Sequence, residues 1–283
     1  MGRSSIDQRV FFYKRLRRID FKTTVDWDEV SGPDRHGPLL RVTFKPNLSG
    51  VAKARYDIPF GIIERNADGT EYPGQKWVDI GDDQSGFSLI NNGRYGFRCA
   101  GSALSMTCIR TSYAPDPQPD RGKSTFDYAL FPHRGDPVAA GTPQEAAGFN
   151  SPLIPIAIQG QAVRNGSAKQ LQPASLEHSS FSLIRVEAKG VIVSSVKRHT
   201  DGKGVVIRIY ELQGTEKVLT VETALELERV EEISPTEDRV ITEVRITKKS
   251  SAFADHIGKY EIKTYRLTGR LSRASEAGFK KQD

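Results

Sequence analysis

The chain has 283 residues, a hydrophobic fraction of 37% and a formal net charge of +6. This length suits two domains of ordinary size, and no apolar run approaches the roughly 18 residues of a membrane-spanning helix. Two basic clusters, 14–18 and 280–281, carry much of the charge, but signs are interspersed elsewhere and no nucleic-acid motif is present. We therefore expect neither nucleic acid nor a membrane as a partner. The N-terminus lacks the apolar core of a signal peptide, which makes the cytoplasm the expected location.

Alternation of apolar and polar residues, the pattern of a strand with one buried face, dominates the chain. It is clear over 19–27, 40–44, 104–108, 219–228 and 240–246. Turn signals separate the strands at Asp68-Gly69, Asn92-Gly93, Ala100-Gly101-Ser102 and Thr200-Asp201-Gly202. Many short strands at such spacing predict an all-β protein built from β-sandwiches.

Helix is expected only in short pieces. Thr142 resembles an N-cap, Pro143 then takes the first helical position and Glu145 the first turn, which predicts a helix that ends by Asn150. The stretch 219–233 is rich in Glu and Leu and also permits a helix, but its strict alternation favours strands.

The composition changes over 159–180, where Gly, Pro, Ser and Gln replace large apolar residues. The organisation we expect is a large β-sandwich over 1–160, a linker over 161–179, a small C-terminal β-sandwich over 180–271 and a flexible tail over 272–283.

Side chains capable of catalysis do not gather into a recognisable site. Cys99 would face a residue near Leu104 across the Gly101 hairpin, so the register argues against a disulfide with Cys108. The five histidines lack metal-ligand spacing, and His199-Thr200-Asp201 is interpreted as a turn. Nucleophile elbows and phosphate-binding loops are also missing from the sequence. We expect no catalytic residue, no metal and no cofactor in this chain.

Ordered segments through the whole chain carry a family resemblance. They are FGIIER at 60–65, QKWVD at 75–79, GFSLINNGRYG at 86–96, APDP at 114–117, DRG at 120–122 and FDYALFPH at 126–133, with RIDF at 18–21 upstream and VIRIYE at 206–211 and EIKTYR at 261–266 downstream. Together they resemble the C-terminal β region of glycoside hydrolase family 38 α-mannosidases, of the cytosolic and bacterial kind.

The resemblance implies a portion of a large galactose-mutarotase-like supersandwich followed by a small immunoglobulin-like sandwich. It also implies retaining hydrolysis of α-mannosides by the whole enzyme, with the zinc ligands and nucleophilic aspartate in an N-terminal catalytic domain that nothing in this chain matches. That domain and an α-mannoside are the implied partners, and a homo-oligomer is a further state to test. The chain alone is expected to be inactive.

Three residues are implied at the sugar site. Arg65 matches an arginine that approaches the sugar in the family, and Tyr56 and Asp57 precede it. A structural ion pair of Arg65 with Glu64 or Asp57 is an equally weighted interpretation. Ser124 stands where the family commonly has His, which places fine substrate contacts in question.

The tryptophans have two interpretations, because aromatic faces suit sugar rings but strand tryptophans commonly lie in the core. Trp27 continues an apolar face and is expected in the core, while Trp77 fits either role. For the whole chain, the favoured hypothesis is the non-catalytic C-terminal β region of an α-mannosidase, which packs on the catalytic domain and helps to wall the sugar site. The alternative is a free-standing carbohydrate-binding β-sandwich module.

Overall fold

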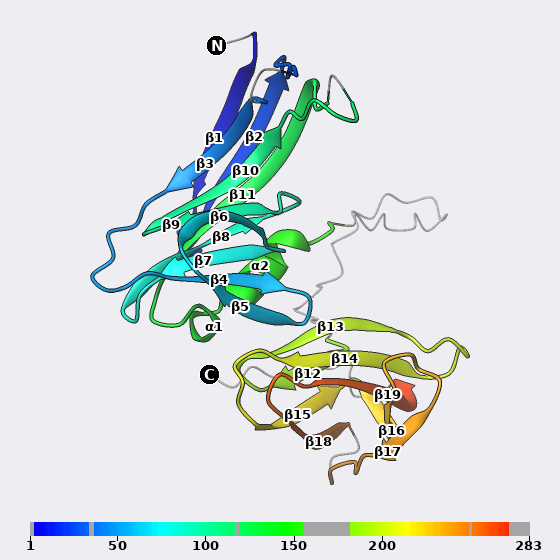
Figure 1. The fold of residues 1–283 in the computed structure, drawn as a ribbon. Helices are drawn as coiled ribbons and strands as arrows, with labels where there is room; N and C mark the ends of the chain where they lie inside the picture. Colours follow the sequence, from blue (N-terminus) through cyan, green and yellow to red (C-terminus); the bar gives the residue numbers. More distant parts are fainter. Residues whose placement is uncertain (1–2, 34–36, 117–118, 156–181, 249–250, 272–283) are drawn as a thin grey trace, which may run out of the picture. The chain divides into compact units, whose positions relative to one another are not determined.

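The computed structural model describes residues 3–33, 37–116, 119–155, 182–248 and 251–271. It divides the chain into an N-terminal unit, Met1–Pro152, and a C-terminal unit, Leu153–Asp283. Nearly all of the regular structure is β-strand (Figure 1), which confirms the all-β prediction. The linker predicted over 161–179 and the tail predicted over 272–283 lie outside the described residues.

The N-terminal unit consists of two antiparallel sheets that enclose one core. The seven-stranded sheet has the order β1 (Ser5–Phe12), β2 (Ile19–Trp27), β11 (Gly122–Arg134), β8 (Ser85–Asn91), β7 (Trp77–Gly81), β4 (Lys53–Ile58) and β5 (Gly61–Arg65). The four-stranded sheet has the order β3 (Leu39–Phe44), β10 (Ala103–Arg110), β9 (Gly96–Ala100) and β6 (Asp68–Pro73).

The core of this unit follows from the alternation in the sequence. Inward side chains of both sheets, such as Val25, Leu89 and Met106, are fully buried in one cluster. Trp27 joins that cluster, as expected, and its indole Nε1 donates to the Thr111 hydroxyl at 2.7 Å. Each such large apolar side chain contributes about 1.5–3 kcal/mol by leaving water.

The hairpin that joins β9 to β10 confirms the prediction for the cysteines. Cys99 lies opposite Leu104 in the ladder, and both Cys99 and Cys108 are free thiols in the core.

Two short helices, α1 (Pro137–Ala140) and α2 (Thr142–Asn150), follow β11. They lie against the other face of the seven-stranded sheet, where Ala146 packs with Trp77 and Phe131 in a second, smaller cluster. The helix predicted from Thr142 is confirmed, but the predicted cap is wrong. Gly141 is the N-cap, in a left-handed conformation, and Thr142 is already helical. Its hydroxyl lies 2.8 Å from Ser88 Oγ on the sheet and so does not cap the helix.

The C-terminal unit is a smaller pair of antiparallel sheets around its own core. One sheet has the order β12 (Ile184–Glu187), β15 (Lys217–Thr223) and β18 (Ala252–Ile257), and the other β13 (Val191–Arg198), β14 (Val205–Glu211), β19 (Ile262–Leu271), β16 (Leu225–Ile233) and β17 (Val240–Glu243).

The apolar run over 219–233 is extended rather than helical, as the alternation predicted. It is not one strand, however, because the chain passes from β15 to β16 at Ala224 and so crosses from one sheet to the other. Consecutive residues Thr223, Ala224 and Leu225 are all buried at this crossing, which interrupts the period of two.

The predicted turns have different outcomes. Thr200-Asp201-Gly202 forms the turn between β13 and β14, with Gly202 N–H bonded to His199 C=O at 2.9 Å. Asp68-Gly69 lies inside β6, where Gly69 has a φ of 89° and the register with β9 shifts, so this prediction of a turn is wrong. A glycine with a positive φ occurs in irregularities of a strand, such as β-bulges, as well as in turns. The dipeptide Asp-Gly therefore does not show which of the two structures is present.

Candidate functional site

A pocket of about 750 Å³ lies in the N-terminal unit beside the ends of β4 and β5. The loop from β6 to β7, the end of β8 and the end of α2 complete its wall. The residues that line it are Asp57, Ile58, Pro59, Arg65, Pro73, Gly74, Gln75, Lys76, Asn91, Tyr95 and Asn150. Gln75, Lys76 and Tyr95 are exposed, so the pocket opens to solvent.

Arg65 is held at this pocket by two aromatic rings. Its guanidinium carbon lies 5.0 Å from the ring centroid of Tyr56 and 4.7 Å from that of Tyr72. Its Nη1 donates to the Pro73 carbonyl at 3.4 Å. A cation between two ring faces is attracted by both, and the planar guanidinium keeps several N–H donors in a fixed fork.

The ion pair that competed with a sugar role for Arg65 does not form. Glu64 lies 3.8 Å from Arg55 Nε instead, and Asp57 accepts a hydrogen bond from the Lys76 backbone N–H at 2.9 Å. Arg65 therefore lies at the pocket wall against the rings of Tyr56 and Tyr72, and it has no carboxylate partner among the described residues.

Asp57 places a buried carboxylate on the same wall. Burial raises its pKa to about 6, although the bond from the Lys76 backbone N–H works in the opposite direction. The carboxyl group thus changes charge near neutral pH, where it can both donate and accept hydrogen bonds.

Tyr56, the third residue implied by the resemblance, has no exposed surface. Its hydroxyl lies 3.3 Å from Cys99 Sγ, inside the core, and its ring faces Arg65. Of the three residues, only Asp57 and Arg65 line the pocket and can contact a solute directly.

Two asparagines that sequence reasoning missed shape the far side of the pocket. The Asn91 side chain accepts from the backbone N–H groups of Gly93 and Arg94 and donates to the Gln75 carbonyl at 2.6 Å. Asn150 Nδ2 donates to the Asn91 carbonyl at 3.0 Å, which ties the end of α2 to the end of β8. In the sequence, the Asn92-Gly93 turn signal indicates that a turn begins next to Asn91. No local pattern points to Asn150, its partner on α2, which is 59 residues away.

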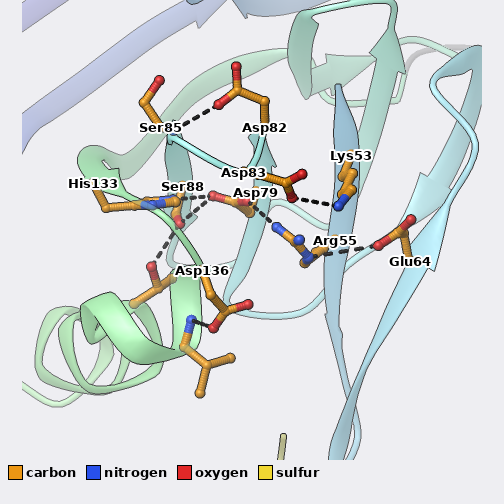
Figure 2. Close-up of polar contacts among 12 residues, drawn as sticks. Lys53, Arg55, Glu64, Asp79, Asp82, Asp83, Ser85, Ser88, His133 and Asp136 are labelled. Atoms are coloured by element: carbon orange, nitrogen blue, oxygen red, sulfur yellow. Dashed lines mark hydrogen bonds and ion pairs between the residues drawn. The ribbon is translucent and has the colours of Figure 1, made fainter. Parts of the chain in front are cut away.

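A buried polar cluster lies between the sheet and the helices, and we call its members, Arg55, Asp79, Ser88, His133 and Thr142, the Asp79 cluster. Figure 2 shows four of them, Arg55, Asp79, Ser88 and His133. Asp79 Oδ2 is 2.6 Å from His133 Nε2 and accepts from Ser88 Oγ at 2.9 Å. Ser88 Oγ is 2.8 Å from Thr142 Oγ1, and Arg55 Nη1 is 3.6 Å from Asp79 Oδ1.

The Asp79 cluster combines a serine, a histidine and an aspartate but lacks the geometry of a nucleophilic triad. Ser88 and His133 both bond to the same carboxylate oxygen of Asp79, whereas a triad needs the histidine between the serine and the acid. The side chains of Asp79 and His133 are wholly buried, so a substrate cannot reach them. The cluster instead fastens the first turn of α2 to the strands, which holds Asn150 at the pocket.

Other candidates from the sequence are also structural. Trp77, which fitted either a core or a sugar-stacking role, is 1% exposed and packs under the helices. His199 Nδ1 lies 2.8 Å from Asp201 Oδ1 within the predicted turn. The described residues contain no group of three or more His, Cys, Asp or Glu side chains that could hold a metal ion. Neither of the described helices has the length and apolar content that crossing a bilayer requires.

Comparison with protein-family models gives a match to each unit. The model described as glycosyl hydrolases family 38 C-terminal domain matches residues 1–118. The model described as glycosyl hydrolases family 38 C-terminal beta sandwich domain matches residues 190–265. The two matches together cover more than half of the chain, in the order that the resemblance implied.

Curated relatives are α-mannosidases. The chain is 28% identical over 276 residues to alpha-mannosidase G of Dictyostelium discoideum, covering 94% of this chain and 24% of the relative. It is 26% identical over 282 residues to an alpha-mannosidase of Saccharomyces cerevisiae, covering 89% of this chain and 24% of the relative. The chain therefore spans about a quarter of the length of these relatives.

Solved structures share the fold. An alpha-mannosidase from Enterococcus faecalis V583 superposes with a TM-score of 0.66 at 17% identity, covering 92% of this chain and 28% of that one. A family 38 protein from Enterococcus faecalis gives a TM-score of 0.65 at 18% identity over 92% of this chain and 29% of that one. At this identity the likeness is one of fold.

Proposed function

This chain belongs to the C-terminal β region of glycoside hydrolase family 38, and we propose that it is the non-catalytic part of a longer α-mannosidase. In this proposal it packs on a catalytic domain, which supplies the zinc and the nucleophile, and contributes one wall of the site for a terminal α-mannoside. The observation that carries the proposal is the pocket whose wall includes both Arg65 and Asp57.

The chemistry of the pocket suits a sugar. The Arg65 guanidinium offers fixed donors to sugar hydroxyls and is already held by Tyr56 and Tyr72, so little side-chain freedom is lost on binding. Asp57 offers an acceptor within the same wall. The exposed ring of Tyr95 adds a flat apolar surface of the kind on which the carbon face of a pyranose packs.

Exposed apolar side chains next to the pocket support packing on another domain. Phe60 and Ile63, on the β4–β5 turn and on β5, are 40% and 39% exposed and lie just before Arg65 in the chain. β5 is an edge strand of the described seven-stranded sheet and carries Arg65 at its end, so a domain that covers this edge would lie beside the pocket. The share of the relatives' length that this chain spans leaves ample chain for such a domain.

The test is hydrolysis of 4-nitrophenyl α-mannoside by the chain alone and with the catalytic domain of the same enzyme. We expect no turnover by the chain alone, and activity of the catalytic domain that rises when the chain is added. Arg65→Lys removes a hydrogen bond from a charged donor, worth about 1.5–3 kcal/mol, and should raise KM by roughly 10- to 100-fold. Arg98→Lys, a half-buried arginine on β9 outside the pocket, is the matched control and should leave KM unchanged.

A free-standing carbohydrate-binding module is the second candidate, because the pocket has donors, an acceptor and an exposed aromatic ring on a single unit. Calorimetric titration of the isolated chain with mannobiose separates the two. No binding is expected under the favoured proposal, since half of the site is missing. Saturable binding that Arg65→Lys abolishes would establish the module and overturn the favoured proposal.

A further inference from the structure

The pocket in the N-terminal unit has a deep end and a mouth, which differ in how far their residues are buried. Asp57 and Asn91 are buried and form the deep end. Gln75, Lys76 and Tyr95 are exposed and form the mouth. Pockets of roughly 300–1,000 Å³ enclose drug-sized molecules, and a disaccharide has that size. At about 750 Å³ the pocket therefore has room for two sugar units, one at the deep end and one at the mouth.

Tyr95 is the aromatic residue of this lining, and its side chain is 59% exposed on a turn that is held firmly. Its backbone C=O accepts from the Gly74 N–H at 3.0 Å. Just before it, the N–H groups of Gly93 and Arg94 each donate to Asn91 Oδ1 at 2.9 Å. A tyrosine on a fixed backbone has two side-chain torsions left to lose when a ligand packs on its ring, so it offers a large contact area at little entropic cost.

The side chain of Arg94 fastens the same turn to β11. Its guanidinium carbon lies 4.7 Å from the ring centroid of Phe126, and its Nη2 donates to Ser124 Oγ at 2.8 Å. Ser124, at which the chain departs from the family pattern, does not line the pocket. Because its contact is with the turn, any effect of Ser124 on a substrate passes through the position of Tyr95.

The burial of the lining indicates which part of a substrate meets Tyr95. An enzyme that removes a terminal sugar holds that sugar at the closed end of its site, with the rest of the substrate directed outward. The terminal mannose then lies near Asp57, and the group to which it is bonded lies at the mouth. A pyranose at the mouth can pack its C–H face on the Tyr95 ring, while its hydroxyls bond to the exposed side chains of Gln75 and Lys76.

We propose that Tyr95 determines specificity for the leaving group: its ring is the platform on which the sugar released by hydrolysis packs. The whole enzyme then prefers an oligosaccharide to an α-mannoside with a small leaving group. This inference rests on the proposed function, because a catalytic domain must cleave the bond. It adds to that function a second sugar, bound at the mouth of the pocket, and a residue that selects for it.

Two substrates that share the mannose but differ in the leaving group test the proposal, with the complex of this chain and its catalytic domain as the enzyme. α-Mannosyl fluoride releases fluoride, which is too small to reach the mouth, whereas mannobiose releases a sugar. Tyr95→Ala should lower kcat/KM for mannobiose by roughly 5- to 30-fold, because the aromatic contact is lost. It should leave kcat/KM for α-mannosyl fluoride unchanged.

Two further variants show whether the ring itself is responsible. Tyr95→Phe keeps the ring and should keep kcat/KM for both substrates within about twofold of the unchanged complex. Tyr113→Ala is the matched control, because Tyr113 is an exposed tyrosine of the same unit that does not line the pocket, and it should change neither value. Thermal unfolding followed by tryptophan fluorescence confirms that each variant is folded.

Three results overturn the proposal. An equal loss on both substrates would place the Tyr95 ring against the terminal mannose, and no loss on either would remove it from the site. A loss with Tyr95→Phe as large as that with Tyr95→Ala would show that the hydroxyl acts and not the ring. Failure of the proposed function looks different, because the unchanged complex would then hydrolyse neither substrate faster than the catalytic domain alone, and this inference would fall with it.

Discussion

Replacing Asp57 by asparagine should stabilise the N-terminal unit at neutral pH. The side chain is 7% exposed, and burial raises its pKa from 3.8 to about 6. A carboxyl group with a raised pKa binds its proton more tightly in the folded than in the unfolded state, so stability falls as pH rises from about 4 to about 6. The asparagine side chain has no charge to bury, and its carbonyl oxygen can still accept from the Lys76 backbone N–H.

The magnitude follows from the shift. A difference of about 2 units, at 1.36 kcal/mol per unit, gives an upper value of about 3 kcal/mol above pH 7. For a unit of about 150 residues this corresponds to roughly 6–12 °C in Tm. As the pH falls through about 4 the carboxyl becomes neutral in the unfolded state as well, so the advantage of Asp57→Asn should become small at pH 4 and vanish well below it.

Tryptophan fluorescence reports this unit selectively. The chain has two tryptophans, Trp27 and Trp77, and both are buried in the N-terminal unit. Urea unfolding followed by fluorescence at pH 4, 5, 6 and 7 therefore gives the free energy of unfolding of this unit, and the difference between the Asp57→Asn variant and the unchanged chain isolates Asp57.

Asp68→Asn is the matched control in the same unit. Hydrogen bonds from Thr70 lower the pKa of this exposed carboxyl. Its removal should therefore slightly destabilise the unit at neutral pH, whereas Asp57→Asn should stabilise it. The reasoning about Asp57 is refuted if Asp57→Asn destabilises the unit at pH 7, or if its effect is the same at pH 4 and pH 7.

Three further outcomes are expected. The Asp82 carboxylate accepts backbone N–H bonds from Ser49 and Gly50 on one oxygen and from Gln84 and Ser85 on the other, and these bonds lower its pKa to about 2. Asp82→Asn should therefore lower the fluorescence-detected Tm at pH 7, by an amount that shrinks as the pH falls from 4 towards 2. Glu211 is fully buried, accepts from the Gln213 and Gly214 backbone N–H groups and pairs with Lys217 at 2.8 Å. Glu211→Ala should destabilise the C-terminal unit by about 3–5 kcal/mol, measured by calorimetry, because it leaves the Lys217 charge without its partner. The Tm that tryptophan fluorescence reports for the N-terminal unit should not change. Burial raises the pKa of the Cys99 and Cys108 thiols to about 11. Both thiols should therefore resist Ellman's reagent at pH 8 in the folded chain and react at once in urea. Rapid reaction of either thiol in the folded state would contradict its buried position.

The fold class and the course of most strands could be predicted from local pattern. A period of two in apolar residues determines which face of a strand is buried, whatever the strand pairs with, and this placed Val25, Trp27 and Leu104 correctly. The same pattern does not say where a strand leaves one sheet for the other. For that reason the break at Ala224 was missed.

The site was predictable in part. The family resemblance pointed to Arg65 and Asp57, and both lie on the wall of the pocket. Tyr72, which supports Arg65, and Asn150, which completes the rim, could not be found in the same way. The first depends on how β6 pairs with β9, and the second on how α2 packs on the sheet.

What the sequence by itself determined is an all-β chain, its free cysteines, its short helix and its membership of the family 38 C-terminal region. These rest on periodicity, turn chemistry and ordered motifs, which are local or cumulative properties. Only the tertiary structure decided that Arg65 stacks on two rings instead of pairing with a carboxylate, and that Asp79, Ser88 and His133 form a buried anchor. Each of these depends on contacts between residues far apart in the chain, and such contacts are set by strand register and packing.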